Sequence, residues 1–522
     1  MREGDIGKEG ILFSTILSGA IYGIDCHLVC VEVDLSQGLP CFVMVGNLGS
    51  EVKEAGERVR IALKNSGIVI PPMHISVNIS PGNVRKEGTG FDLPIAIGVL
   101  EAMGKLPAGC TERTLLLGEL SLDGGLKPIR GVLPMIHLAK RSGVKWCIVP
   151  EQNLREAAAV SGIKAVGIET LGQAISYLSL DKDKRDELSL PQADLVEKNE
   201  KREQQVDFAE ILGQENVKLG ALIAAAGFHH ILIVGPPGAG KTMIARRLPT
   251  ILPPLSKAES LEVSSLHSIS GRLEQGKVLM TNRPFLSPHH TISPQALSGG
   301  GKIPRPGVIS LAHRGILFLD ELPEFKRQTL DLLRQPLEDK EIQIARSSGI
   351  FTYPADIMLC GAMNPCPCGY YPDRNKCRCT PFEIHTYLSH ISGPILDRID
   401  IFVMASKMEI GQLQSGIKGE TSAEMRRKVM KARRMQEDRY RGTKIRFNAD
   451  LGAGQVEQYC ELGREEKAMM EHLFKSLDLS ARAYHRMLKV ARTIADLDQS
   501  ERIRTEHIAQ AACYRRMELL EG

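Results

Sequence analysis

The feature that most constrains the fold is a glycine-rich octapeptide between a short apolar run and a segment of helical character. The apolar run 231–234 predicts a buried strand, and residues 243–248 predict the start of a helix. Glycines let backbone N–H groups turn toward phosphate oxygens, and the helix N-terminus adds a favourable field for an anion. The pattern predicts a phosphate-binding P-loop in which Lys241 reaches the β- and γ-phosphates and Thr242 holds Mg²⁺. The residues of the octapeptide, which fit G-x-x-x-x-G-K-[ST], are Gly235, Pro236, Pro237, Gly238, Ala239, Gly240, Lys241 and Thr242.

Two further apolar runs end in polar residues that suit nucleotide hydrolysis. Residues 315–319 lead into Asp320 and Glu321, and residues 357–363 lead into Asn364. Asp320 fits a Walker B acid that holds Mg²⁺ through water, and Glu321 fits the group that polarises the attacking water. An amide such as Asn364 at a strand end can orient that water. An apolar run followed by two acids is common by itself, but together with the P-loop it predicts an ATP–Mg²⁺ site.

Two arginines later in the chain are candidates for contact with the γ-phosphate. Arg398, in Leu-Asp-Arg-Ile-Asp, is a candidate arginine finger donated to a neighbouring subunit's nucleotide. The alternative is an ordinary salt-bridged arginine. Arg482 opens a helix of the last domain and is a candidate for reaching the γ-phosphate from a lid.

The length of 522 residues predicts roughly three domains. Residues 1–180 are expected to form a mixed α/β domain, and the charged, apolar-poor stretch 181–205 a linker or an exposed helix. A second α/β unit over 206–405 carries the P-loop, and 406–522 is expected to be a helical domain. In the first domain the strand-like runs are 28–33, 42–45, 75–79 and 147–149, and the helical segments are 51–65 and 134–142.

Composition excludes little beyond a membrane protein. The formal net charge of +4 neither requires nor excludes nucleic acid, so any basic surface must be local. No stretch approaches the ~20 apolar residues of a membrane span, and the N-terminus lacks the layout of a signal peptide. We therefore expect a cytoplasmic protein, with its 12 cysteines as buried thiols or metal ligands.

Four cysteines lie close together in the pattern C-x-C-x8-C-x-C. They are Cys366, Cys368, Cys377 and Cys379. Four thiolates can bind Zn²⁺ tetrahedrally, which predicts a structural zinc site. The C-x-C spacing is tighter than the usual C-x2-C, and the alternative is a redox-sensitive or merely exposed thiol cluster.

The ordered set of P-loop, Asp320 and Glu321, Asn364, Arg398 and Arg482 resembles an AAA+ ATPase. Further motifs narrow the resemblance to the magnesium-chelatase-like AAA+ family, which includes the YifB and ComM proteins, over almost the whole chain. The resemblance implies an AAA+ α/β/α core, a C-terminal helical lid and a homo-hexameric ring with nucleotide between subunits. ComM-like members imply an ATP-driven DNA motor, or helicase, that promotes branch migration in recombination or transformation. The further motifs lie at 283–285, 288–291, 299–307 and 364–369.

Two loops would face the pore of such a ring. One is the glycine-rich segment 298–307, with Lys302 and Arg305, and the other is the hairpin-like segment 341–351, with Arg346 near its tip. Cations at these places can track a phosphate backbone without reading its sequence. The alternative is a pair of solvated surface turns.

The N-terminal domain resembles the proteolytic domain of Lon, through the motifs at 86–94 and 118–127. Lon uses a Ser–Lys dyad, and Lys127 falls at the position of the lysine. The position of the serine is occupied by Gly90, which has no nucleophile, and Thr89 is one residue away. The resemblance therefore implies a Lon-like fold without peptidase activity.

Three other functions remain open at this point. The motor subunit of a metal chelatase would use the same ATPase module, although this chain shows no large porphyrin-binding domain. An ATP-dependent protease conflicts with Gly90, and a scaffold without catalysis conflicts with two intact Walker elements.

Overall fold

The computed structural model describes residues 12–188, 206–273, 279–301, 304–346, 349–407 and 419–515. The chain divides into two compact units. The first comprises residues 1–200 and 260–280, and the second comprises 201–259 and 281–522. Both are mixed α/β structures, as the sequence predicts, and the predicted domain boundaries at 180, 205 and 405 stay predictions. No helix in the described ranges is both long and apolar enough to cross a membrane.

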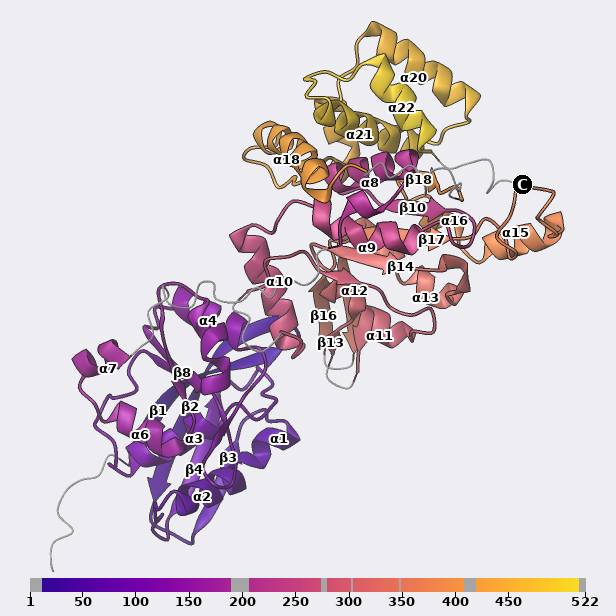
Figure 1. Ribbon diagram of the computed structural model, residues 1–522. Coiled ribbons are helices and arrows are strands. Elements are labelled where there is room, and N and C mark those ends of the chain that lie inside the picture. The colour runs from indigo at the N-terminus through magenta and orange to yellow at the C-terminus, as the bar shows by residue number, and fades with distance from the viewer. Residues whose placement is uncertain are drawn as a thin grey trace, which may run out of the picture. The chain divides into compact units, whose positions relative to one another are not determined.

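The first unit is built on a seven-stranded sheet with the strand order β3-β4-β2-β1-β5-β8-β9. Figure 1 labels β1, β2, β3, β4 and β8 of this sheet. The β1–β2 and β2–β4 pairs are antiparallel, and the other neighbours are parallel. The four predicted strands lie within β2, β3, β4 and β8 and are confirmed. The strands are β1 (Phe13–Tyr22), β2 (Asp25–Ser36), β3 (Cys41–Val45), β4 (His74–Ser80), β5 (Thr114–Leu116), β8 (Trp146–Pro150) and β9 (Lys164–Ile168), with a separate β6 (Glu119–Leu120) and β7 (Leu126–Lys127) ribbon.

Helices cover both faces of this sheet because side chains alternate along its strands. On β5, Leu116 belongs to the core shared with α2 and α3, whereas Leu115 belongs to the core shared with α4 and α5. Every residue of α3 is buried. The helices are α1 (Ser50–Lys53), α2 (Ala55–Asn65), α3 (Asp92–Ala102), α4 (Val132–Arg141), α5 (Leu154–Ala158), α6 (Leu171–Leu178) and α7 (Lys182–Leu188).

The second unit contains a five-stranded sheet with the order β11-β14-β17-β10-β18, in which all neighbours are parallel. In such a sheet the carboxyl ends of the strands lie at one edge, where α/β proteins bind their ligands. The chain segments that follow β10, β14 and β17 therefore meet at this edge. The strands are β10 (Ile231–Val234), β11 (Phe285–Leu286), β14 (Ile316–Leu319), β17 (Met358–Met363) and β18 (Ile401–Met404).

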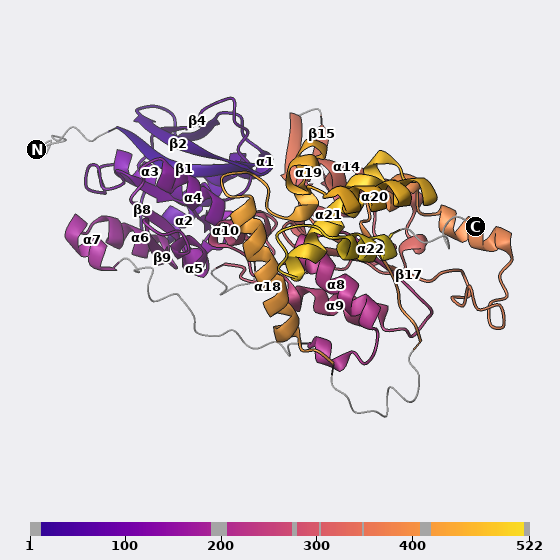
Figure 2. The same cartoon turned by 90° about the horizontal axis from the view of Figure 1, so that it is seen from above.

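One hydrophobic core joins this sheet to the C-terminal helices. α8 (Glu215–Gly227) and α9 (Lys241–Ile251) both pack against α18 (Ser422–Arg439), as seen in Figure 2. Residues 419–515 contain helices and no strand, and these helices continue with α19 (Ala453–Tyr459), α20 (Arg464–Ser476), α21 (Ala481–Leu497) and α22 (Thr505–Cys513). The other α-helices in the described ranges are α10 (Lys257–Ile269), α11 (Pro294–Ser298), α12 (Val308–Leu311), α13 (Arg327–Asp331), α14 (Arg334–Asp339), α15 (Pro381–Ser389) and α16 (Gly393–Leu396).

Candidate functional site

The octapeptide 235–242 joins β10 to α9 at the carboxyl edge of the five-stranded sheet. Gly238 and Gly240 have φ angles of +77° and +79°, in the left-handed region that glycine adopts without steric cost. Gly235 has no room for a side chain, because a Cβ atom there would lie 2.4 Å from the carbonyl oxygen of Ala405. The backbone therefore turns sharply from strand to helix, as a phosphate-binding loop requires.

Lys241 connects this loop to the neighbouring strand β17. Its Nζ donates to the carbonyl oxygens of Gly235 at 2.7 Å and Pro236 at 3.0 Å. It also donates to Oδ1 of Asn364 at 3.0 Å. Burial lowers the pKa of Lys241, and the two carboxylates that follow β14 act in the opposite direction. Lys241, which is predicted to bind phosphate, is thus in direct contact with Asn364, which is predicted to orient the attacking water.

Thr242 and Asp320 bring the two predicted Mg²⁺-binding oxygens together. Oγ1 of Thr242 donates to Oδ2 of Asp320 at 2.7 Å, although 78 residues separate them in the sequence. Hydroxyl and carboxylate oxygens are donors that suit Mg²⁺, so the residues present fit the ion. The elements that position them are the first turn of α9 and the end of β14.

Glu321 has a backbone conformation that is uncommon for its residue type. Its φ angle is +51°, and residues held in this region cost about 1–3 kcal/mol and cluster at active sites. Its backbone N–H donates to Oδ1 of Asp320 at 3.0 Å, and its side chain is 61% exposed. The turn after β14 therefore directs one acid toward Thr242 and leaves the second open to a water molecule.

His290 is a residue of this site to which the sequence pattern assigns no role. Its Nδ1 lies 3.6 Å from Oε2 of Glu321, and its ring lies against that of His289, with centroids 4.1 Å apart. The segment 288–291 follows β11, whose carboxyl end lies at the same sheet edge as those of β10 and β14. This position, close behind a short strand, is the signal that identifies it.

Arg398 and Arg482 meet at a single carboxylate, that of Glu338 in α14. Arg398 donates to one carboxylate oxygen through Nη2, and Nη2 of Arg482 lies 3.2 Å from the other. All three residues line a cavity of about 440 Å³, and none of the P-loop residues lines it. The structure thus brings the two arginines together with each other, and both stand apart from Lys241.

Two β-hairpins carry the described candidate DNA contacts. β12 (Gly299–Gly300) pairs with β13 (Arg305–Pro306), and β15 (Glu341–Arg346) pairs with β16 (Gly349–Pro354). The hairpins touch: a Cβ atom on Gly300 would lie 3.1 Å from Nη2 of Arg346, and the Tyr353 hydroxyl donates to the Pro304 carbonyl oxygen at 2.8 Å. The side chains of Arg305 and Arg346 are both exposed. Lys302 lies outside the described residues.

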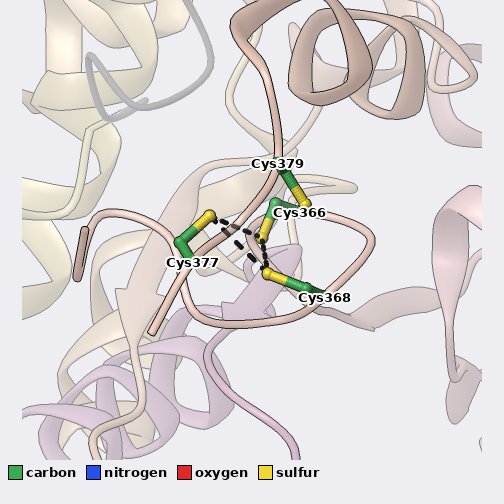
Figure 3. Close-up of side chains that lie close together, drawn as sticks. All are labelled: Cys366, Cys368, Cys377 and Cys379. Carbon is green, nitrogen blue, oxygen red and sulfur yellow. Dashed lines mark hydrogen bonds between the residues drawn. The ribbon is translucent and has the colours of Figure 1, made fainter. Parts of the chain in front are cut away.

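The four cysteines of the C-x-C-x8-C-x-C pattern converge in space (Figure 3). Their sulfur atoms all lie within 4.8 Å of one another. The three separations among Cys366, Cys368 and Cys377 are 3.4, 3.6 and 3.8 Å. Zn–S bonds of about 2.3 Å in a tetrahedron place sulfur atoms about 3.8 Å apart, so the donor set fits Zn²⁺.

Burial and neighbouring thiols raise the pKa of Cys377 and Cys379, whereas the pKa of Cys368 is lowered. Desolvation raises its pKa, but hydrogen bonds from the backbone of Tyr370 and Arg378 and from neighbouring thiols lower the pKa to about 6. None of the cysteines in the described ranges forms a disulfide.

Comparison with known proteins identifies the family. The model for magnesium chelatase, subunit ChlI, matches residues 207–413, and the models for subunit ChlI of Mg-chelatase and for its C-terminal region match 31–153 and 419–515. Competence protein ComM of Haemophilus influenzae is 42% identical over 510 residues, which cover 96% of this chain and 97% of that protein. The chain belongs to the magnesium-chelatase-like ComM/YifB family. The uncharacterized protein YifB of Escherichia coli is similar, with 41% identity over 509 residues that cover 97% of this chain and 98% of that protein.

A partial match bears on the Lon-like motifs of this ComM/YifB family member. Lon protease 2 of Bacillus subtilis is 32% identical over 130 residues, which are 25% of this chain and 23% of that protein. At the position expected for a serine, a Cβ atom on Gly90 would lie 3.2 Å from Cδ1 of Ile129. The Thr89 hydroxyl donates to the carboxylate of Glu119. Glu119 on β6 lies opposite the exposed Lys127 on β7 in the register of these two strands. The one hydroxyl next to Gly90 is therefore bound to a carboxylate.

Proposed function

We propose that this protein is an ATP-hydrolysing DNA motor that assembles as a homo-hexameric ring and drives branch migration or translocation in recombination or transformation. The observation that carries the ATPase part is the convergence of three strand ends. Lys241, Thr242, Asp320 and Asn364 are linked there by hydrogen bonds of 2.7–3.0 Å. Membership of a family that includes a protein named for competence supports the DNA part.

Each residue of the converging set has a defined part in hydrolysis. Lys241 binds the β- and γ-phosphates of ATP, and Thr242 and Asp320 hold Mg²⁺, the latter through water. Glu321 polarises the attacking water, and its exposure leaves room for that water beside the carboxylate. Asn364 orients the same water from the end of β17.

The ring is supported by the position of the two arginines. An arginine that stabilises charge on the γ-phosphate must reach it, and both Arg398 and Arg482 are engaged by Glu338 in a cavity that no P-loop residue lines. If Arg398 and Arg482 reach the nucleotide of a neighbouring subunit, both arginines act on the same γ-phosphate. The helices after residue 419 then form the lid of the ATPase module.

DNA contacts are assigned to the two touching hairpins. Arg305 and Arg346 lie exposed on them, and Lys302 belongs to the same glycine-rich segment. Contacts from exposed guanidinium groups to phosphates bind without sequence preference and weaken with salt. The N-terminal unit is proposed to be a Lon-like domain without peptidase activity, and the four cysteines a structural zinc site.

The proposal is tested by measuring ATP turnover with and without single-stranded, duplex and four-way-junction DNA. Stimulation by DNA, strongest with the junction, is the expected result. ATP hydrolysis that ignores all three DNAs would overturn the DNA motor. In parallel, stimulation by the catalytic subunit of a metal chelatase, in place of DNA, would favour the chelatase function that the family models name.

A further inference from the structure

The cysteine cluster and the ATP site lie on one continuous stretch of chain. Asn364 ends β17, Cys366 follows two residues later, and Cys379 precedes the residue that caps α15. Residues 364–380, all of which the structure describes, contain no helix or strand. Backbone hydrogen bonds of turns hold parts of this segment, such as Cys377 N–H to the carbonyl oxygen of Asp373, and a bound metal ion would order it further, because metal binding is coupled to folding.

The first turn of this segment packs against the P-loop. Gly369 adopts φ = +82°, and a Cβ atom there would lie 2.4 Å from Cδ of Pro237. The same residue donates its N–H to the carbonyl oxygen of Cys366 at 2.9 Å. A shift of Cys366 or Gly369 is therefore transmitted to the loop that cradles the phosphates.

The far end of the segment returns to the ATP site through α15. Thr380 forms a capping box with Glu383 and fixes the start of this helix directly after Cys379. Burial raises the pKa of Tyr387, farther along α15, and the adjacent backbone of Asn364 acts to lower it. His390 Nδ1 lies 3.0 Å from the carbonyl oxygen of Pro323, two residues beyond Glu321.

We propose that a zinc ion bound by the four cysteines positions the P-loop, Asn364 and the Glu321 turn, so that metal occupancy controls the rate of ATP hydrolysis. The ion ties residue 366 to residue 379, and the contacts at Pro237, Asn364 and Pro323 carry that constraint to three catalytic segments. The inference rests on the ATPase part of the proposed function. The cysteines have a positioning role, because in the described part of the chain the hydrogen bonds of their thiols join them to one another and to backbone groups such as that of Tyr371, and not to a candidate catalytic side chain.

The first test compares zinc-loaded and chelator-treated full-length protein. Zinc content is measured by mass spectrometry, affinity with a fluorescent ATP analogue and turnover by phosphate release. We expect about one zinc ion per chain, and a turnover that falls about 10- to 100-fold on zinc removal, as displaced catalytic groups cause. Nucleotide affinity should fall as well, because the P-loop is one of the displaced segments, and zinc should restore both in the presence of constant Mg²⁺. Zinc-free reduced protein, or a rate that ignores zinc loss, overturns the proposal.

Two variants separate positioning from folding. Gly369→Ala keeps all four thiols but places a methyl group against Pro237, so zinc content should stay at the wild-type level while turnover falls. Gly442→Ala is the matched control, because Gly442 has φ = +81° and no atom within 4 Å of its Cβ position. Cys379→Ser should lose zinc and rate together, whereas Cys513→Ser, outside the cluster, should lose neither. Equal rates in Gly369→Ala and Gly442→Ala would contradict the coupling.

The outcomes also separate this inference from the proposed function. A zinc-dependent ATPase that DNA does not stimulate would retain the coupling and reject the DNA motor. A DNA-stimulated ATPase whose rate ignores zinc would do the reverse.

Discussion

Nζ of Lys241 donates to Oδ1 of Asn364 over 3.0 Å, so one hydrogen bond joins the P-loop to the end of the adjacent strand β17. Bound phosphate would compete for the same ammonium group, because Lys241 is also the cation of the phosphate-binding pattern. The amide of Asn364 is then released to the water beside the γ-phosphate. Nucleotide binding and the placement of Asn364 are linked through this bond.

Lys241→Ala should abolish nucleotide binding and turnover. It removes the cation that meets the β- and γ-phosphates and the bond to Asn364 at once. Titration of a fluorescent ATP analogue measures the affinity. Lys64→Ala, an exposed lysine near the end of α2, is the control and should bind as wild type. Unchanged nucleotide affinity in Lys241→Ala would show that the P-loop is not the nucleotide-binding site.

Glu321→Gln should bind ATP with nearly unchanged affinity. Its rate of hydrolysis should be lower than that of wild type by at least about 100-fold, as expected on loss of a general base. The amide keeps the shape of the side chain but cannot polarise water. Single-turnover hydrolysis measures the chemical step. Glu324→Gln, an exposed acid in the same turn, should retain the wild-type rate. Full hydrolysis by Glu321→Gln would assign the water to another group, with His290 the nearest candidate.

The candidate ATP site was predictable because parallel strands buried on both faces appear in sequence as continuous apolar runs. The run 231–234 is β10, and the runs before Asp320 and Asn364 contain β14 and β17. Polar residues directly behind such runs must gather at the carboxyl edge of the sheet. The sequence therefore specified this set of contacts before any pairing of strands was known.

The meeting of the two arginines at Glu338 was not predictable in the same way. Glu338 lies 60 residues before Arg398 and 144 residues before Arg482, and no local pattern links them. α3 shows the same limit in packing, since its apolar residues have no amphipathic period and every residue is buried. In both cases the tertiary fold, and no spacing along the chain, decides the neighbours.

Arg398→Ala and Arg482→Ala should each abolish hydrolysis and should each regain part of it when mixed with Lys241→Ala subunits. Both arginines bind one carboxylate here, so both are expected to face the same nucleotide of a neighbouring subunit. ATP turnover of mixed rings, against each variant alone, is the measurement. Recovery with Arg398→Ala but not with Arg482→Ala would place Arg482 at its own subunit's nucleotide.

Arg346→Ala should weaken DNA binding alike for unrelated sequences. Loss of one phosphate contact makes the negative slope of log affinity against log salt less steep, by about 0.9 for duplex and about 0.7 for single strands. Binding of labelled DNA at several salt concentrations gives that slope. Lys467→Ala, an exposed lysine on α20, is the control and should leave the slope unchanged. A wild-type slope in Arg346→Ala would show that Arg346 does not contact DNA.

Asp400, directly before β18, should make the stability of the second unit depend on pH in the acidic range. Its carboxylate lies 3.3 Å from Nδ1 of His229 and accepts the N–H of His230 at 3.2 Å. Burial raises its pKa, but the hydrogen bond and charge of His229, and the charges of His230 and Lys489, hold the pKa well below the usual range. A carboxyl whose pKa is lower in the folded state adds stability above its unfolded pKa of about 3.9, and this contribution is lost as the pH falls below that value.

Asp400→Asn should therefore lower the free energy of unfolding at pH 7 by about 1.5–3 kcal/mol, the usual contribution of hydrogen bonds to a charged group. The deficit should shrink as the pH falls from 5 toward 3, since the Asp400 carboxyl of the unfolded wild-type chain then takes up a proton while the folded one stays charged, and the charge therefore stabilises the fold less. Urea unfolding at several pH values measures the difference. Asp438→Asn, whose side chain is 71% exposed, should differ little from wild type at any pH. A deficit for Asp400→Asn that stays constant between pH 5 and pH 3 would show that the lost packing, and not the buried charge, stabilises this strand.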